Sequence, residues 1–118
     1  MRTKPYRRLE SIWAGGGVVI LDGGVGSELQ RVGFPRDRNF GELWGTVALL
    51  EAPDLAQEVH RRYVRAGADV ITTHTWRIDG LGTGAKLRTT ARQAVQLARE
   101  AAEELARPGT AVAFSVWP

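Results

Sequence analysis

Residues suited to binding a small polar ligand follow the first apolar segment of the chain. Asp22 is a carboxylate that could pair with an ammonium group, and Gly23, Gly24 and Val25 come directly after it. Glycines let the backbone approach a ligand closely, and successive N–H groups can hold a carboxylate or a phosphate. The same pattern also suits a tight turn in which Asp22 caps the following helix. From the residues alone, the ligand-binding and the turn interpretations weigh equally.

A second polar group, Thr73 and His74, lies at the end of a later β-branched segment and would share an edge with Asp22 if both segments are parallel strands. The chain has two histidines and no cysteine, so a metal ion would need carboxylates among its ligands. His74 is therefore expected to line the site without binding a metal ion. A purely structural role for His74 is the alternative. The other histidine, His60, lies in a helical pattern, where a solvated or helix-packing role is expected. The residues themselves predict no metal site and identify no catalytic group.

Tryptophans are the third residue type that could build a site. Aromatic side chains are more often part of a core than walls of a ligand site. Two of them follow predicted strands and would crowd the same edge as His74. The four tryptophans are Trp13, Trp44, Trp76 and Trp117.

Alternating strand and helix patterns position these residues. Apolar β-branched runs predict strands at 18–21, 69–75 and 111–116. Apolar stripes at spacings of three and four predict helices over 53–67 and 86–106. Shorter helical pieces are expected at 25–32 and 42–51, and loops at 36–41 and 80–84. The order predicts an α/β fold with parallel strands and right-handed crossovers, which fits either a doubly wound sheet or the start of an eightfold barrel.

Composition excludes several classes of protein. The 118 residues suit one small domain, and 43% hydrophobic with 25% charged residues is ordinary for a globular chain. The lack of cysteine excludes a disulfide scaffold and a thiolate zinc site within these residues, and it fits a cytoplasmic location. No apolar run approaches the ~20 residues of a membrane-spanning helix, so no membrane partner is expected.

Basic residues gather at the start of the chain. The net charge of +3 and the pI near 9.9 would suit a nucleic-acid partner. The charges are mostly spread along helical faces, however, so a solvated surface is the favoured interpretation and nucleic-acid binding is not expected. The one cluster, Arg2, Lys4, Arg7 and Arg8, lies in residues 1–17, which are predicted to be a basic flexible leader ending in a run of three glycines.

Several ordered blocks resemble one known family. The stretch from Ile20 to Leu29, which contains the Asp22 glycine turn, resembles the opening strand and turn of the homocysteine S-methyltransferase family. Further matching blocks lie at 43–44, 51–55, 59–63, 66–73 and 94–101. The resemblance runs from Val18 to Pro118 and is more specific than any single glycine motif. It implies that residues 18–118 are a partial homocysteine-binding domain, the N-terminal portion (about three βα units) of a (β/α)8 TIM-type barrel.

The resemblance also implies a reaction. Family members transfer a methyl group to the sulfur of homocysteine to give methionine, with a zinc ion on three cysteines that binds the thiol and lowers its pKa. Those cysteines lie in later strands, so this truncated chain by itself is expected to hold no cofactor and to be inactive. The implied partners are homocysteine, a methyl donor, and either the missing C-terminal half or a second copy of the chain at open strand edges. The alternative is a non-catalytic module, derived from that barrel, that binds small molecules or oligomerises.

Site residues follow from the same resemblance. Asp22 would help to hold the substrate ammonium, and the backbone of residues 23–25 would approach the amino-acid end of the substrate. Thr73 and His74 would lie near the pocket. His74 stands where the family usually has asparagine, and Trp117 stands where a glycine commonly precedes the proline, so it would fill space that glycine leaves open.

Overall fold

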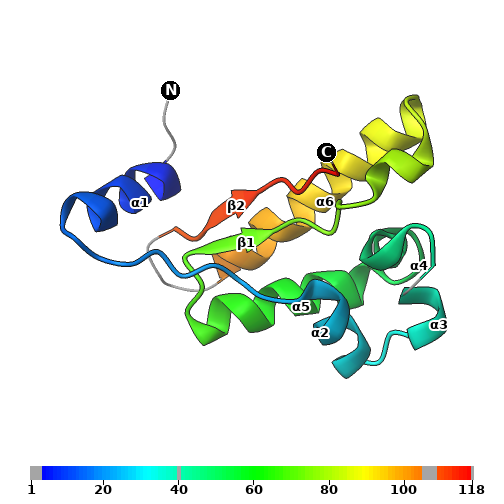
Figure 1. Cartoon of the computed structure of the whole chain (residues 1–118), viewed down its shortest axis with the longest axis horizontal. Helices are drawn as coiled ribbons and strands as arrows, with labels where there is room; N and C mark the ends of the chain where they lie inside the picture. The colour runs from blue at the N-terminus through cyan, green and yellow to red at the C-terminus, as the bar shows by residue number, and fades with distance from the viewer. Residues whose placement is uncertain (1–3, 40, 105–108, 118) are drawn as a thin grey trace.

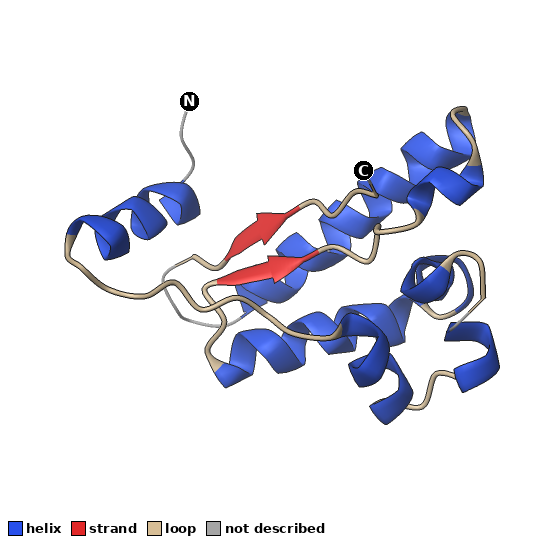
Figure 2. Cartoon of the chain, viewed as in Figure 1, coloured by secondary structure: helices blue, strands red, loops and turns tan. Residues whose placement is uncertain are grey.

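The chain forms a mixed α/β structure whose parallel strands are covered by helices on one face (Figures 1 and 2). The computed structural model describes residues 4–39, 41–104 and 109–117. Strands β1 (Val70–Thr72) and β2 (Ala111–Ala113) pair in parallel, with Ile71 opposite Val112. The predicted parallel α/β alternation is therefore confirmed.

The predicted first strand is reduced to a single parallel bridge between Leu21 and Val70. Two backbone hydrogen bonds hold it, from Asp22 N to the Val70 carbonyl at 2.9 Å and from Asp69 N to the Ile20 carbonyl at 2.7 Å. The sheet order is thus segment 20–22, β1, β2. Among the described residues, segment 20–22 and β2 each pair with β1 only, so their outer edges are open. All three segments pair over fewer residues than the predicted strands contain.

Helices α5 (Pro53–Ala66) and α6 (Ala85–Glu104) pack on each other and on β1. Pro53 suits the first turn of α5 because its missing N–H would be unpaired there. Gly67 ends the helix in the left-handed conformation with φ 107°, which a side chain would strain. The prediction for α5 is confirmed, and α6 begins one residue before its predicted start. The last predicted residues of α6, 105–106, lie outside the described residues.

The long connection between segment 20–22 and β1 contributes most of the first core cluster. It contains α2 (Val25–Arg31), α3 (Arg36–Asn39), the 3-10 helix η1 (Trp44–Thr46) and α4 (Val47–Glu51). The prediction of a loop over 36–41 was wrong for α3, and η2 (Ile78–Leu81) begins just before the expected loop at 80–84. The two core clusters join this connection to α5, α6 and β1 through Leu29, Phe34, Val47, Ala48, Leu49, Ala56, Val59 and Ala94, and through Val64, Ala68, Ile71, Ala98 and Ala102.

Helix α1 (Lys4–Ala14) lies at the N-terminal ends of the strands (Figure 1). Its Leu9 is buried, and its Arg8 Nη2 donates to Asp69 Oδ1 at 2.7 Å. The structure is thus helical over most of the segment for which the sequence predicted a basic flexible leader, and the flexibility of that segment stays a prediction. The division of the chain at residue 17 stays a prediction. Of the helices described, none combines the length and the apolar character needed to cross a membrane.

Candidate functional site

A pocket of about 260 Å³ opens at the C-terminal ends of the parallel strands. Parallel α/β folds bind their ligands at this end of the sheet. The structure brings five of the six predicted site residues to its walls, namely Asp22, Gly23, Val25, Thr73 and His74. The sixth, Gly24, lies outside the lining and serves as the N-cap residue of α2. Binding of substrate by these residues stays a prediction.

Asp22 is fixed at the pocket wall by the neighbouring strand. Its Oδ2 accepts the backbone N–H of Thr72 at 2.7 Å, and its Oδ1 accepts the Thr72 hydroxyl at 3.0 Å. Partial burial raises the pKa of Asp22, and the hydrogen bonds from Thr72 oppose this by stabilising the carboxylate. The alternative in which Asp22 caps the next helix was wrong, because the N-cap residue of α2 is Gly24 and no side chain caps it. Each carboxylate oxygen keeps a lone pair for a ligand.

Close packing behind the glycine turn involves Tyr63 of α5. A Cβ atom at Gly23 would lie 3.0 Å from Tyr63 Oη, too close for ordinary contact. The Tyr63 hydroxyl also donates to the Gly24 carbonyl at 3.0 Å. Burial, with the charges of Glu28 and Asp22, raises the pKa of Tyr63, so the hydroxyl keeps its proton. The turn is therefore held at a fixed distance from α5, and glycine is needed at position 23 for that approach.

His74 lines the pocket and is only 3% exposed. Its ring meets the ring of the fully buried His60 edge to face, with centroids 4.6 Å apart and an interplanar angle of 67°. None of the four ring nitrogens has a hydrogen-bond partner within the described residues. Burial lowers the pKa of His60 to about 4, and burial together with His60 lowers the pKa of His74 well below 6.5. Both rings are therefore neutral at pH 7, and the helix-packing alternative for His60 is confirmed.

Three hydrogen bonds around Thr73 and Thr75 fix the backbone on both sides of His74. Ser115 N donates to Thr73 Oγ1 at 3.2 Å, and Thr75 Oγ1 donates to the Ser115 carbonyl at 2.7 Å. The two threonine hydroxyls are 2.6 Å apart. Because the Thr75 proton is used on the carbonyl, Thr73 must be the donor in the hydroxyl pair. This closed ring ties the end of β1 to the continuation of β2, and the sequence reasoning missed Thr75 and Ser115.

Asn39, at the end of α3, also lines the pocket and was missed by the sequence reasoning. It is 1% exposed, and its Nδ2 donates to the Gly26 carbonyl at 2.7 Å. Its Oδ1 is buried and has no hydrogen-bond partner in the part of the chain that the structure describes. In the sequence, Asn39 is a single polar amide between two predicted helical pieces. No periodic pattern there predicts that it lies beside Asp22.

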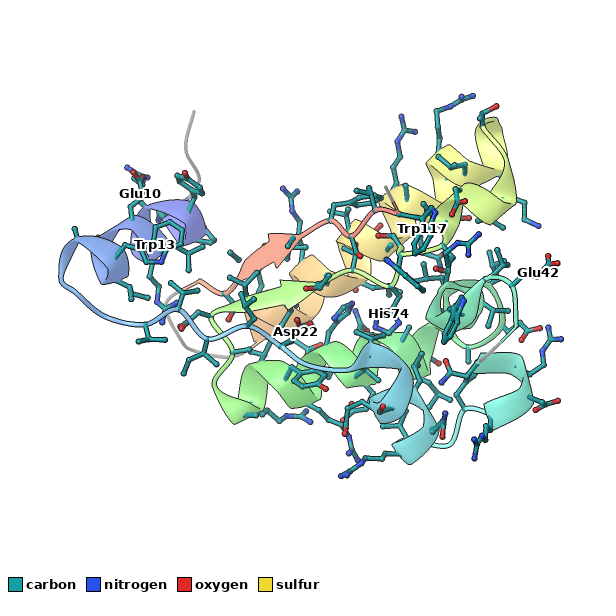
Figure 3. The ribbon with its side chains drawn as sticks, viewed as in Figure 1. Glu10, Trp13, Asp22, Glu42, His74 and Trp117 are labelled. Carbon is teal, nitrogen blue, oxygen red and sulfur yellow. The ribbon has the colours of Figure 1, made fainter. Side chains whose placement is uncertain are left out.

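Three tryptophans form an aromatic cluster, and two of them line the pocket. Trp44 and Trp76 line it, with ring centroids 5.6 Å apart, and Trp76 meets Trp117 at 4.8 Å. The Arg77 guanidinium lies 5.2 Å from the centre of the Trp117 ring. These side chains are partly exposed, so the expectation that they belong to the core was wrong, and the expected crowding of Trp76 and Trp117 at one edge is confirmed. Figure 3 labels Asp22, His74 and Trp117, which come from three separate segments.

The described residues contain no group of three or more His, Cys, Asp or Glu side chains that could hold a metal ion. The whole chain also lacks cysteine, the ligand that the family resemblance implies for zinc. The residues present therefore do not fit a zinc site held by cysteines.

A pocket at the C-terminal ends of parallel strands is the place where α/β folds, doubly wound sheets and barrels alike, bind their ligands. The family model described as homocysteine S-methyltransferase matches residues 19–118. The chain therefore belongs to the homocysteine S-methyltransferase family, and the predicted family membership is confirmed.

Individual relatives agree with this assignment. Homocysteine S-methyltransferase 1 of Zea mays is 36% identical over 95 residues, which cover 75% of this chain and 28% of the relative. Selenocysteine Se-methyltransferase of Brassica oleracea var. italica is 38% identical over 81 residues, covering 69% and 22%.

Solved structures of the homocysteine methyltransferase MmuM from Escherichia coli share the fold. The oxidized form matches with a TM-score of 0.77 and 31% identity, and the metallated form with 0.75 and 32%. The match covers 98% and 97% of this chain respectively, and 41% of each solved chain. The chain thus spans less than half the length of the relatives it matches.

Proposed function

We propose that this chain supplies the part of a homocysteine S-methyltransferase pocket that holds the amino-acid end of homocysteine. The complete protein would transfer a methyl group to the homocysteine sulfur and give methionine. The observation that carries the proposal is the Asp22 carboxylate, which Thr72 holds at the wall of a small pocket at the C-terminal strand ends. Membership of the family and similarity to MmuM support it.

The chemistry proposed for these residues is recognition. Homocysteine carries an ammonium group, a carboxylate and a thiol. An ionised Asp22 would attract the ammonium group, and the close approach of the turn at Gly23 leaves backbone space for the amino-acid end. Thr73 is fixed by its hydrogen-bonded ring and His74 contributes a neutral imidazole, so neither places a competing charge beside the substrate. The pocket would hold and orient the substrate while other residues act on its sulfur.

These 118 residues by themselves are proposed not to catalyse methyl transfer. They include no cysteine, and they correspond to 41% of the MmuM chain. The zinc implied for the complete family domain would be held by residues outside this chain. Incubating the chain with homocysteine and S-methylmethionine should give no methionine above the rate without protein, and a clear enzyme-dependent rate would contradict this part of the proposal.

The binding proposal is tested with reduced L-homocysteine and isothermal titration calorimetry on the 118-residue chain. The expected result is binding that Asp22→Asn weakens at least about tenfold, because a charge-assisted contact to the ammonium group is lost. Asp79→Asn is the matched control, since Asp79 is an exposed carboxylate outside the pocket. No binding by the unaltered chain, or equal binding by Asp22→Asn in a folded sample, would overturn the proposal.

The same chain would associate with further strands of a family barrel. Apolar side chains are exposed along both outer members of the sheet: Ile20 55%, Leu21 65%, Phe114 43% and Val116 64%. Unpaired strand edges with exposed apolar groups favour association. We expect light scattering after size-exclusion chromatography to report species larger than a monomer for the chain alone, reduced by Leu21→Lys. A monodisperse monomer would contradict the proposed association, and a defined dimer would favour a second copy as the occupant.

A further inference from the structure

Asn39 lines the pocket and has one buried hydrogen-bond acceptor without a partner among the described residues, and the orientation of its amide is determined by its surroundings. The Gly26 carbonyl can only accept, so the atom that contacts it at 2.7 Å must be the amide nitrogen. Oδ1 is therefore the atom left over, and it is buried without a partner among the described residues. A Cβ atom at Gly26 would lie 3.4 Å from Nδ2 and one at Gly45 would lie 3.9 Å from Oδ1, so both glycine backbones border the amide. The side chain is held between them in one orientation.

Among the polar groups that line the pocket, Asp22 and Asn39 both carry acceptor oxygens that can still receive a hydrogen bond. Asp22 contributes two carboxylate oxygens, and the Thr72 groups that touch them have already used their protons on this carboxylate. Asn39 adds the unpartnered Oδ1, while the neutral His74 ring brings one donor and one acceptor. A buried acceptor without a partner is unfavourable, so a ligand that brings several N–H donors fits this wall better than one that brings only acceptors.

We infer that Asn39 is a substrate-binding and specificity-determining residue, whose Oδ1 accepts a hydrogen bond from the primary ammonium group of the ligand that Asp22 attracts. This inference rests on the proposed function and extends it to a residue of α3. The charge of Asp22 would attract the ammonium group, and Asn39 would fix the orientation of that group. The Asn39 amide is held in one orientation, whereas a carboxylate accepts hydrogen bonds over a wide range of angles. A ligand without the amine would leave Oδ1 unpaired and would bind more weakly.

The test compares three ligands that differ in one group each. L-homocysteine has amine, carboxyl and thiol; 3-aminopropane-1-thiol lacks the carboxyl; and 4-mercaptobutanoic acid lacks the amine. Calorimetry on the 118-residue chain should show that the two amines bind and that the acid binds at least about tenfold more weakly. Asn39→Leu should weaken both amines about tenfold and leave the acid unchanged. Gln96→Leu is the control, because it removes an exposed amide far from the pocket lining.

A second measurement needs no variant, and so it remains informative if Asn39→Leu does not fold. Asn39 is the only asparagine in the chain, so selective 15N-asparagine labelling gives one side-chain amide signal. Adding either amine should shift that signal, and adding the acid to the same concentration should not. A signal that is unmoved by bound amines would overturn the inference.

The outcomes separate the inference from the proposed function. If homocysteine binds but neither its amine nor Asn39 affects affinity, the inference is wrong and the proposed function stands. If 3-aminopropane-1-thiol binds through Asn39 and homocysteine does not bind, the proposed function is wrong and the inference stands. If none of the three ligands binds, both are wrong.

Discussion

The two ends of the short parallel sheet each contain an aspartate that bridges neighbouring segments. They differ in how many buried polar atoms lack a hydrogen-bond partner. At the N-terminal end, Asp69 accepts the Ile20 N–H at 2.8 Å and pairs with Arg8 at 2.7 Å, beneath helix α1. At the C-terminal end, Asp22 accepts both groups of Thr72 but faces a pocket. Among the described residues, one buried side-chain atom at the N-terminal end, Arg8 Nη1, has no hydrogen-bond partner, whereas His60, His74 and Asn39 leave five such atoms at or next to the pocket.

We expect the N-terminal end of the sheet to contribute mainly to stability and the C-terminal end to contribute to the proposed binding. Asp69 is paired with a cation and a backbone N–H and lies outside the pocket lining, whereas Asp22 lines the pocket. Unpaired buried groups lower stability by about 1–3 kcal/mol each, and a ligand that satisfies them recovers part of that cost. The N-terminal end should therefore respond strongly to mutation in unfolding experiments, and the C-terminal end should respond to pH and to ligand.

The largest expected effect is a loss of stability on acidification, and it belongs to the C-terminal end. His60 has a pKa of about 4 when folded and about 6.5 when unfolded, so between these values the unfolded state binds a proton that the folded state does not. The contribution of His60 to stability should fall by about 3 kcal/mol as the pH decreases from about 7 to about 4 and should level off below that. His74 acts in the same direction, and Asp22, whose pKa is raised, opposes it.

Urea denaturation across this pH range measures the effect. His60→Phe should flatten the pH dependence, because it removes the group that resists protonation. The two histidines also give only two imidazole signals in an NMR titration. If both titrate near 6.5, the buried neutral pair does not exist in solution, and the comparison between the two ends loses its main feature.

The next largest effect is expected from Asp69→Ala at the N-terminal end. Removing the carboxylate leaves the Arg8 guanidinium partly buried and the Ile20 N–H without its side-chain acceptor. Breaking a buried pair in this way should cost about 2–3 kcal/mol, near the lower limit for such pairs because Arg8 is partly exposed. Urea denaturation at pH 7 checks this. Glu103→Ala, at an exposed position on α6, is the control and should stay within about 0.5 kcal/mol; equal effects of the two changes would contradict the assigned role of Asp69.

A smaller effect is expected from Thr75→Val, which keeps the shape of the side chain and removes its hydroxyl. The Ser115 carbonyl loses its donor and the Thr73 hydroxyl loses its acceptor. Such a loss should cost about 1–2 kcal/mol in the free energy of unfolding. Thr89→Val is a matched control on the exposed face of α6 and should have almost no effect. A cost confined to ligand affinity, with unchanged stability, would show that the ring does not support the sheet.

The smallest effect tests the spacing between the glycine turn and α5. Tyr63→Phe removes the donor to the Gly24 carbonyl, and about 0.5–1 kcal/mol of stability should be lost. Gly23→Ala should be destabilising in the unaltered chain, because its Cβ would lie 3.0 Å from Tyr63 Oη, and less so beside Tyr63→Phe. Urea denaturation of the two single variants and the double variant measures this coupling. Additive effects would show that the turn does not rest on Tyr63.

Local patterns predicted the parts of the fold that depend on neighbouring residues. The apolar stripe and the terminal glycine located α5, since both signals lie within the helix itself. The same reasoning failed for α1, which has polar composition, because its helix is anchored by Leu9 and by the distant Asp69. It also overestimated the strands, because the length of a ladder depends on which neighbours pair with it.

The sequence by itself determined the family, the parallel α/β order and five of the residues that surround the pocket. Those conclusions rest on contiguous motifs, such as the turn at Asp22 and the pair Thr73 and His74, which appear in the chain as short blocks. Only the tertiary structure decided which groups are left without partners. Asn39 and His60 come from segments far from Asp22 in the chain, and whether a polar atom is paired depends on burial and on contacts across the fold. The unpaired buried atoms at and beside the pocket were therefore visible only after the chain was folded.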